Sequence, residues 1–254
     1  MSKKVLNSVS LQTAIRLTGV LLGLVILSNC AYSRSRWEPS VVVVQEPRMQ
    51  FEVEPNLEIT LTAIPGELFI KGVDSNDAVA SMEVRCPSLV GACADHFAGL
   101  EFDIRRSGNN LTIGANKGVP FRGNYAVKTT LALPRIDRLA VKMTAGDVDI
   151  YRVDVNRLDL DMMAGDLKIE VDQLETLKVD LEAGDVNIVI PEDSVAKVDL
   201  DAGVGNASIR KRGRIEDAPR SFLVGAQMLK WISIDGAMVN VDVQFGDIEV
   251  NLTP

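Results

Sequence analysis

Three stretches of this chain repeat an Ala-Gly-Asp tripeptide before an apolar residue: KMTAGDVDIY (142–151), DMMAGDLKIE (161–170) and DLEAGDVNIV (180–189). Their glycines lie nineteen residues apart, and a fourth glycine keeps the same interval: Gly146, Gly165, Gly184 and Gly203. A fixed interval of this length is typical of repeat architectures, in which each unit buries its apolar face against the next unit.

Apolar and polar residues alternate on both sides of each tripeptide. Aligned from Leu139, Leu158, Leu177 and Ala196, the four units give the apolar rows Val141/Leu160/Val179/Val198, Met143/Met162/Leu181/Leu200, Val148/Leu167/Val186/Gly205 and Ile150/Ile169/Ile188/Ala207. A period of two indicates half-buried strands. Each unit is therefore predicted to be a strand, a tight turn, a second strand and a second corner.

The tripeptide suits the tight turn. Glycine reaches the positive φ that a sharp corner needs, and the neighbouring aspartate can hydrogen-bond to backbone close by. The C-terminal stretch MVNVDVQFGDIEVNLTP (238–254) shows the same pattern around Phe-Gly-Asp. The predicted turn residues are Gly146, Asp147, Gly165, Asp166, Gly184, Asp185, Gly203, Gly246 and Asp247.

These features predict an all-β fold, specifically a single-stranded parallel β-solenoid of coils about nineteen residues long. Nineteen residues at about 3.3 Å each provide a contour of about 60 Å, enough for two short strands and two corners. An antiparallel sandwich could show the same alternation, but it would not explain the fixed interval. We expect residues 137–254 to form the repeats and residues 48–136 to form an irregular β portion that caps them within one continuous domain, because an open stack exposes an unpaired edge.

The N-terminal residues 1–30 are typical of an export signal. Two lysines precede the uncharged run LTGVLLGLVILSNC, which is shorter than the roughly 20 residues of a membrane span. The segment LSNC resembles a bacterial lipobox, although Asn29 departs from the usual small residue, and it predicts lipidation of Cys30. Residues 31–47 would then be a tether, and Ala31 favours the outer membrane. Cleavage after Ser33 and an uncleaved apolar anchor are the alternatives.

Charge and cysteine content narrow the function further. Without residues 1–29 the chain has 24 basic and 35 acidic residues, a net charge of −11, which argues against nucleic-acid binding. In an exported protein, Cys86 and Cys93 across a Pro/Gly-containing loop indicate a disulfide worth about 2–3 kcal/mol. The single histidine, His96, lies beside that loop, and nothing around it suggests a catalytic triad.

Outward-facing residues of the repeats suggest two surfaces. The row Lys142/Asp161/Asp180/Asp199, its neighbour Thr144/Met163/Glu182/Asp201 and the corner aspartates would form an acidic stripe. Asp161, Asp180 and Asp199 could bridge Ca²⁺ between coils, or the stripe could be a solvated face. Arg210, Lys211, Arg212 and Arg214 form a basic loop that could contact anionic lipid or an acidic partner, or simply protect an edge.

Repeats of the form LxVxxxAGDVxI, entered through LALPRIDRLAV (131–141), resemble the putative-adhesin β-strand repeat family of bacterial envelope proteins. The resemblance covers about residues 125–192 and 239–252. It implies a β-solenoid domain of unassigned biochemical role and transfers no catalytic residues. We therefore expect a non-enzymatic envelope lipoprotein that acts as a scaffold or adhesin-like module toward an envelope protein or glycan, with no cofactor. A Ca²⁺-stabilised adhesive module and a carbohydrate-active enzyme are the alternatives.

Overall fold

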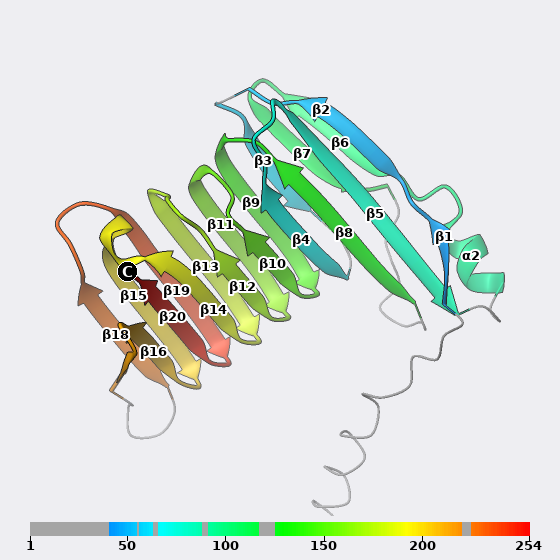
Figure 1. The fold of residues 1–254 in the computed structure, drawn as a ribbon. Helices are drawn as coiled ribbons and strands as arrows, with labels where there is room; N and C mark the ends of the chain where they lie inside the picture. Colours follow the sequence, from blue (N-terminus) through cyan, green and yellow to red (C-terminus); the bar gives the residue numbers. More distant parts are fainter. Residues whose placement is uncertain (1–40, 55, 63–65, 88–90, 117–124, 220–224) are drawn as a thin grey trace, which may run out of the picture. The chain divides into compact units, whose positions relative to one another are not determined.

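The computed structural model describes residues 41–54, 56–62, 66–87, 91–116, 125–219 and 225–254. It confirms the all-β prediction: two sheets account for the strands, with one short helix, α2 (Gly91–Phe97), and one 3-10 turn, η1 (Glu192–Ser194) (Figure 1). In spatial order the first sheet, sheet A, contains β1 (Val41–Gln45), β5 (Asp77–Pro87), β8 (Ala126–Leu133), β4 (Glu67–Gly72), β10 (Val148–Tyr151), β12 (Leu167–Glu170), β14 (Val186–Pro191), β20 (Ile248–Thr253), β16 (Ala207–Lys211) and β17 (Arg214–Asp217), with β2 (Arg48–Glu52) also pairing with β5. Sheet B contains β18 (Ala226–Trp231), β15 (Val195–Val204), β19 (Ala237–Phe245), β13 (Thr176–Ala183), β11 (Val155–Ala164), β9 (Ile136–Ala145), β3 (Glu58–Thr62), β7 (Asn110–Ala115) and β6 (Phe102–Ser107).

The three Ala-Gly-Asp units form successive coils. The coils are β9–β10, β11–β12 and β13–β14, and each contributes its first strand to sheet B and its second strand to sheet A. Strands of successive coils pair in parallel: β9 with β11 and β11 with β13 in sheet B, and β10 with β12 and β12 with β14 in sheet A. Leu139 pairs with Leu158 and Leu158 with Leu177, which is the register that the nineteen-residue interval predicts. The inward residues of both sheets are almost fully buried and form one core between the sheets.

The order of the coils departs from the order of the sequence. The fourth unit, β15–β16, does not lie against β13–β14; the C-terminal coil β19–β20 is inserted between them (Figure 1). Val179 therefore pairs with Val241, and Val241 with Leu200. The prediction that Val198 continues the Val141/Leu160/Val179 row is wrong.

The spacing of the fourth unit explains this arrangement. Its corner glycine is Gly205, which has a φ of +152° and lies twenty-one residues after Gly184, whereas Gly203 has no positive φ. The predicted turn at Gly203 is therefore wrong, and every fourth-unit residue moves two places along its row. The added length includes η1 and a bulge between Val195 and Lys197. It lets the chain advance by two strand spacings, about 10 Å, and leaves a gap that the C-terminal coil fills.

The N-terminal portion extends the stack and then changes its pairing. Strands β3 and β4 form a further parallel coil against β9 and β10, with Ile59 opposite Leu139 and Leu68 opposite Val148. Strands β7 and β8 still pair in parallel with β3 and β4, and antiparallel pairing begins beyond them: β5 pairs with β8, and β6 forms a hairpin with β7. The structure is thus a mixed parallel and antiparallel β fold. Among the described residues its parallel centre has seven layers, in the spatial order β7–β8, β3–β4, β9–β10, β11–β12, β13–β14, β19–β20 and β15–β16.

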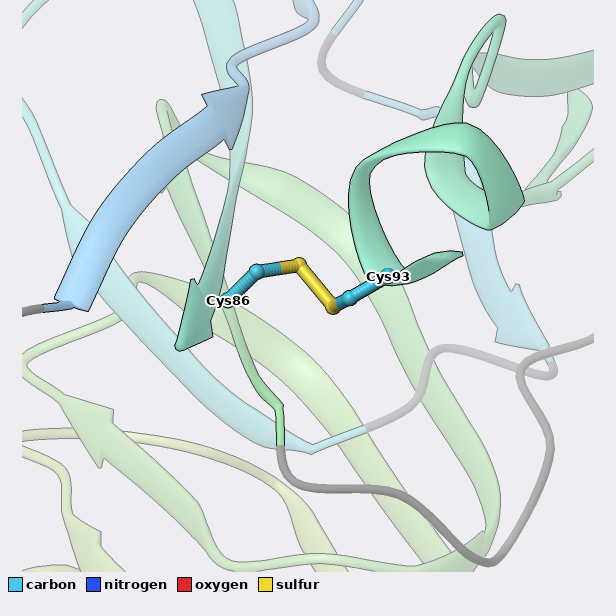
Figure 2. The surroundings of a disulfide bond; sticks show 2 residues. All are labelled: Cys86 and Cys93. Carbon is cyan, nitrogen blue, oxygen red and sulfur yellow. A yellow bond between two sulfur atoms is a disulfide. The ribbon is translucent and has the colours of Figure 1, made fainter. Parts of the chain in front are cut away.

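A disulfide holds α2 to this N-terminal end. Cys86 at the end of β5 is bonded to Cys93 in α2, with their Cα atoms 6.0 Å apart (Figure 2). A small apolar cluster surrounds the bond, separate from the main core: Met82, Val84, Cys86, Phe97, Leu100 and Val127. The disulfide therefore anchors a helix that is too short to be stable by itself.

Candidate interaction surfaces

The corner aspartates connect neighbouring coils rather than capping their own turns. The Asp147 carboxylate accepts a hydrogen bond from the backbone N–H of Asp166 at 3.1 Å, and the Asp166 carboxylate accepts one from Asp185 at 3.1 Å. Asp185 in turn accepts from Asp247 at 2.8 Å, and Asp247 accepts from Asn206 at 2.8 Å. The Asp of the repeated tripeptide therefore has a structural role in fastening each coil to the next.

The corner glycines are required because the backbones of adjacent coils approach closely. A Cβ atom built on Gly165 would lie 1.9 Å from the carbonyl oxygen of Gly146, and one on Gly184 would lie 2.0 Å from that of Gly165. The φ angles of +133° and +138° would also strain any L side chain. The tripeptide thus encodes a corner that can stack at strand spacing.

The acidic stripe lies on the outer face of sheet B, with different members from those predicted. Asp161 pairs with Asp180, Asp180 with Asp242, and Asp242 with Asp201. We call these four residues the aspartate row. The prediction that Asp199 belongs to this row is wrong, because the two-residue shift of the fourth unit places it opposite Asn240, where it pairs with Lys197 at 3.1 Å.

Charges in the aspartate row affect one another. Partial burial raises the pKa of Asp242, and the neighbouring Asp201 and Asp180 raise it further, while Lys178 opposes them. The Lys178 ammonium lies 2.6 Å from the Asp180 carboxylate. Among the described residues, no group of three carboxylate, histidine or cysteine side chains converges as a metal site. Ca²⁺ binding stays a prediction.

The basic loop forms a hairpin of β16 and β17, which are the last two strands of sheet A beyond β20. Arg210 pairs with Glu249 at 2.9 Å, and Glu192 receives Lys211 at 2.9 Å and Arg212 at 3.4 Å. A hydrogen bond from Lys211 lowers the pKa of Glu192. Arg214 is exposed, and within the described ranges it has no ion pair. Internal carboxylates therefore neutralise much of this loop, and a contact with anionic lipid or a partner stays a prediction.

Sheet B ends in an apolar edge. Strand β18 pairs with β15 on one side only, and its outward side chains include Leu229, 60 % exposed, and Trp231, 67 % exposed. Although Trp231 lies in an apolar stretch of the sequence, it is not buried, because β18 has a neighbouring strand on one side only. Its indole instead lies near Lys197, whose Nζ atom is 5.8 Å from the ring centroid.

Sheet A carries a shallow depression on its outer face. Phe69 and Tyr151 contribute aromatic rings from the neighbouring strands β4 and β10, and the volume is about 260 Å³. Polar side chains of Asp149, Lys168 and Asn187 line the same depression. The side chains of Asp149 and Lys168 form no hydrogen bond or ion pair within the described residues. We call this feature the sheet-A trough.

A wider groove follows the second corner of the coils. It has a volume of about 640 Å³ and is lined mainly by charged side chains, including Arg135, Arg152, Asp154, Asp172 and Asp193. Arg152 pairs with Glu170 at 3.0 Å and Arg135 with Asp154 at 3.8 Å. These pairs leave an open, solvated surface of mixed charge.

The predicted lipidation site Cys30 and the predicted export signal lie outside the described residues. In the part of the chain that is described, no helix combines the length and apolar character of a membrane span. His96 in α2 is exposed and contacts the Phe97 ring edge-on, with centroids 5.1 Å apart. No serine or cysteine nucleophile is hydrogen-bonded to it among the described residues.

Comparisons with known proteins agree with this architecture. Residues 133–251, which contain strands β9 to β19 and most of β20, match the family model described as Toastrack DUF4097. A crystal structure of a putative cell adhesion protein from Clostridium sporogenes ATCC 15579 is similar in fold, with a TM-score of 0.50 and 15 % sequence identity over 82 % of this chain and 100 % of that chain. A putative adhesin from Bacteroides fragilis NCTC 9343 aligns over 82 % of this chain and 97 % of that chain with 12 % identity and a TM-score of 0.35. No curated protein matches the sequence.

The match of residues 133–251 to this family model confirms the family resemblance of the repeat region.

Proposed function

We propose that this protein is a non-enzymatic lipoprotein of the bacterial cell envelope that acts as a rigid, adhesin-like interaction module. The observation that carries the proposal is the structural use of the repeated motif. The corner glycines permit close stacking, and the corner aspartates hydrogen-bond successive coils. The chemistry that repeats along the chain therefore builds two broad, charged faces, which suit contact with a large partner better than turnover of a small substrate.

The proposed attachment is an acyl group on Cys30, with the residues between it and β1 as the tether and the outer membrane as the destination. Metabolic labelling with a palmitate analogue tests this step in the whole chain. We expect label on the wild-type protein and none on Cys30→Ala. Equal labelling of both chains would contradict lipidation at this residue, and a signal-peptidase product that begins at another residue would favour ordinary export.

Interaction is tested by photo-crosslinking in the envelope. A photoreactive residue at Lys71 or Asp180 samples the exposed faces of sheets A and B, because both positions lie on outward rows of the parallel coils. We expect a discrete crosslinked band from at least one face. The control position is Val141, which is fully buried on the inward face of β9. Bands that are equally strong from Val141 would contradict recognition through the exposed faces.

The sheet-A trough supports a second candidate function, contact with an envelope glycan. Phe69 and Tyr151 could stack against sugar rings, since both expose apolar ring surface, while Asp149, Lys168 and Asn187 could hydrogen-bond to sugar hydroxyls. The probe is a soluble peptidoglycan fragment in isothermal titration calorimetry. We expect heat of binding from the wild-type chain and its loss in Tyr151→Ala. Binding that is unchanged in Tyr151→Ala and in Phe69→Ala would remove the trough from consideration.

A further inference from the structure

Exposed apolar side chains gather at one end of the stack. Among the described residues, more than half of the exposed large apolar side chains lie between residues 204 and 245: Val204, Ile215, Leu229, Trp231, Ile234, Met238 and Phe245. Ile234, just after β18, is 95 % exposed. A free strand edge flanked by such residues invites pairing with another strand.

Alternate residues of β18 direct their backbone N–H and C=O groups toward β15 or toward the free edge of sheet B. The N–H of Ile232 donates to the carbonyl of Ala196 in β15 at 2.8 Å, so Ile232 directs its backbone groups toward β15. In an antiparallel pair, alternate residues direct both N–H and C=O to the same side. Gln227, Leu229 and Trp231 therefore direct their backbone groups to the free edge, which gives a row of three donors and three acceptors.

We propose that two copies of this chain pair through β18 in an antiparallel, two-fold symmetric dimer centred on Leu229. In this register Leu229 lies opposite the partner's Leu229, and Gln227 lies opposite the partner's Trp231. All of these residues direct their backbone groups to the free edge. Six inter-chain hydrogen bonds form, and sheet B continues from one copy into the other.

The side chains are self-complementary in this register. Residues directly opposite in an antiparallel pair share a face, so Leu229 packs on its symmetry mate and Trp231 packs over the aliphatic part of Gln227 on the outer face. On the inner face Lys230, which pairs with Glu216, lies opposite Met228. No like charges meet within the new strand pair.

The next strand also favours this register. In β15, Lys197 pairs with Trp231 and Asp201 pairs with Gln227. One copy's Lys197 therefore lies in the same cross-strand row as the other copy's Asp201, so opposite charges share two of the three rows. A shift that centres the axis on Lys230 would place two ammonium groups directly opposite each other and is disfavoured.

Disulfide trapping tests the register in the whole chain in detergent under mild oxidation. Hydrogen-bonded antiparallel pairs have Cα atoms about 5.5 Å apart, a separation that a disulfide bridges readily. We expect Leu229→Cys to give a covalent dimer on a non-reducing gel. The double variant Q227C/W231C should also crosslink, whereas each of its single variants should not. The matched control is Met163→Cys, an exposed residue on β11 in the middle of sheet B.

Analytical ultracentrifugation of the same whole chain tests association without crosslinking. We expect a wild-type dimer and a monomeric Leu229→Pro. Proline is tolerated at this position because the N–H it removes points away from β15, so the melting temperature of the monomer should be unchanged. Leu229→Lys, which places two ammonium groups on the axis, should also be monomeric. A monomeric wild-type chain, or crosslinking by Leu229→Cys no greater than by Met163→Cys, overturns the proposal without bearing on envelope contact through the exposed faces.

Discussion

The aspartate row yields the most specific prediction about stability: replacing Asp242 with asparagine should stabilise the fold. Asp242 lies between Asp180 and Asp201 on neighbouring strands, and burial together with these two carboxylates raises its pKa. At a strand spacing of about 4.8 Å, each like-charged neighbour costs about 0.9 kcal/mol in water without salt. Salt at physiological strength roughly halves this value, because the screening length is about 8 Å.

Lys178 offsets part of the repulsion, so we expect Asp242→Asn to raise the free energy of unfolding by about 0.5–1 kcal/mol at low salt. For a domain of this size, that gain corresponds to a rise of about 1–4 °C in melting temperature. The gain should shrink in high salt. Asp95→Asn removes the same charge from α2, away from the row, and should leave the melting temperature unchanged.

The pH dependence provides a second readout of the same variant. The pKa of folded Asp242 lies above its unfolded value of about 3.9, so the folded state binds the proton more tightly. Wild-type stability from this group is therefore greatest below the unfolded pKa and falls as the pH rises through the folded pKa. Asp242→Asn lacks this loss, so the melting temperatures of the two chains should converge in acid and separate toward neutral pH.

Thermal melts with millimolar Ca²⁺ or with chelator, at matched ionic strength, distinguish repulsion from metal binding. A variant that is less stable than wild type, or a calcium-dependent rise in melting temperature that Asp242→Asn abolishes, would refute the electrostatic reasoning. The calcium-dependent result would mean that the aspartate row holds a cation.

Three further predictions concern the corners, the core and the disulfide. Gly165→Ala forces a Cβ against the Gly146 carbonyl at a φ of +133°, so it should lower the free energy of unfolding in urea by more than about 3 kcal/mol. Gly108→Ala, at a φ of +59° in open space, should lower it by only about 1 kcal/mol. Equal losses would contradict the close approach of the coils. Leu160→Ala in the core should cost about 2–5 kcal/mol, against less than about 0.5 kcal/mol for the exposed Met163→Ala, and comparable urea midpoints would argue against the assigned inward face. Replacing both Cys86 and Cys93 with alanine should lower the free energy of unfolding by about 2–3 kcal/mol, and reductant should lower the urea midpoint of the wild-type chain but not of the variant.

Much of the centre of this fold follows from local sequence. The interval between Gly146, Gly165 and Gly184 and the alternation around them predict strands, corners and the register of three coils, because period-two burial and a glycine corner are local properties. The same local signals identify the Phe-Gly-Asp corner at Gly246. The sequence also signals that the fourth unit does not follow directly on the third, since its corner glycine, Gly205, comes two residues later than the nineteen-residue interval requires.

Tertiary structure alone decides which coils are neighbours. Strand pairing in a parallel stack is non-local, and coils with similar apolar rows can occupy any position in it, so β19–β20 lies between units that are consecutive in the sequence. That choice adds Asp242 to the aspartate row, while the two-residue shift of the fourth unit puts Asp201 in the place predicted for Asp199. It also leaves β15 at the end of the stack, where β18 covers it and exposes Trp231, because the last strand of a sheet has a neighbour on only one side.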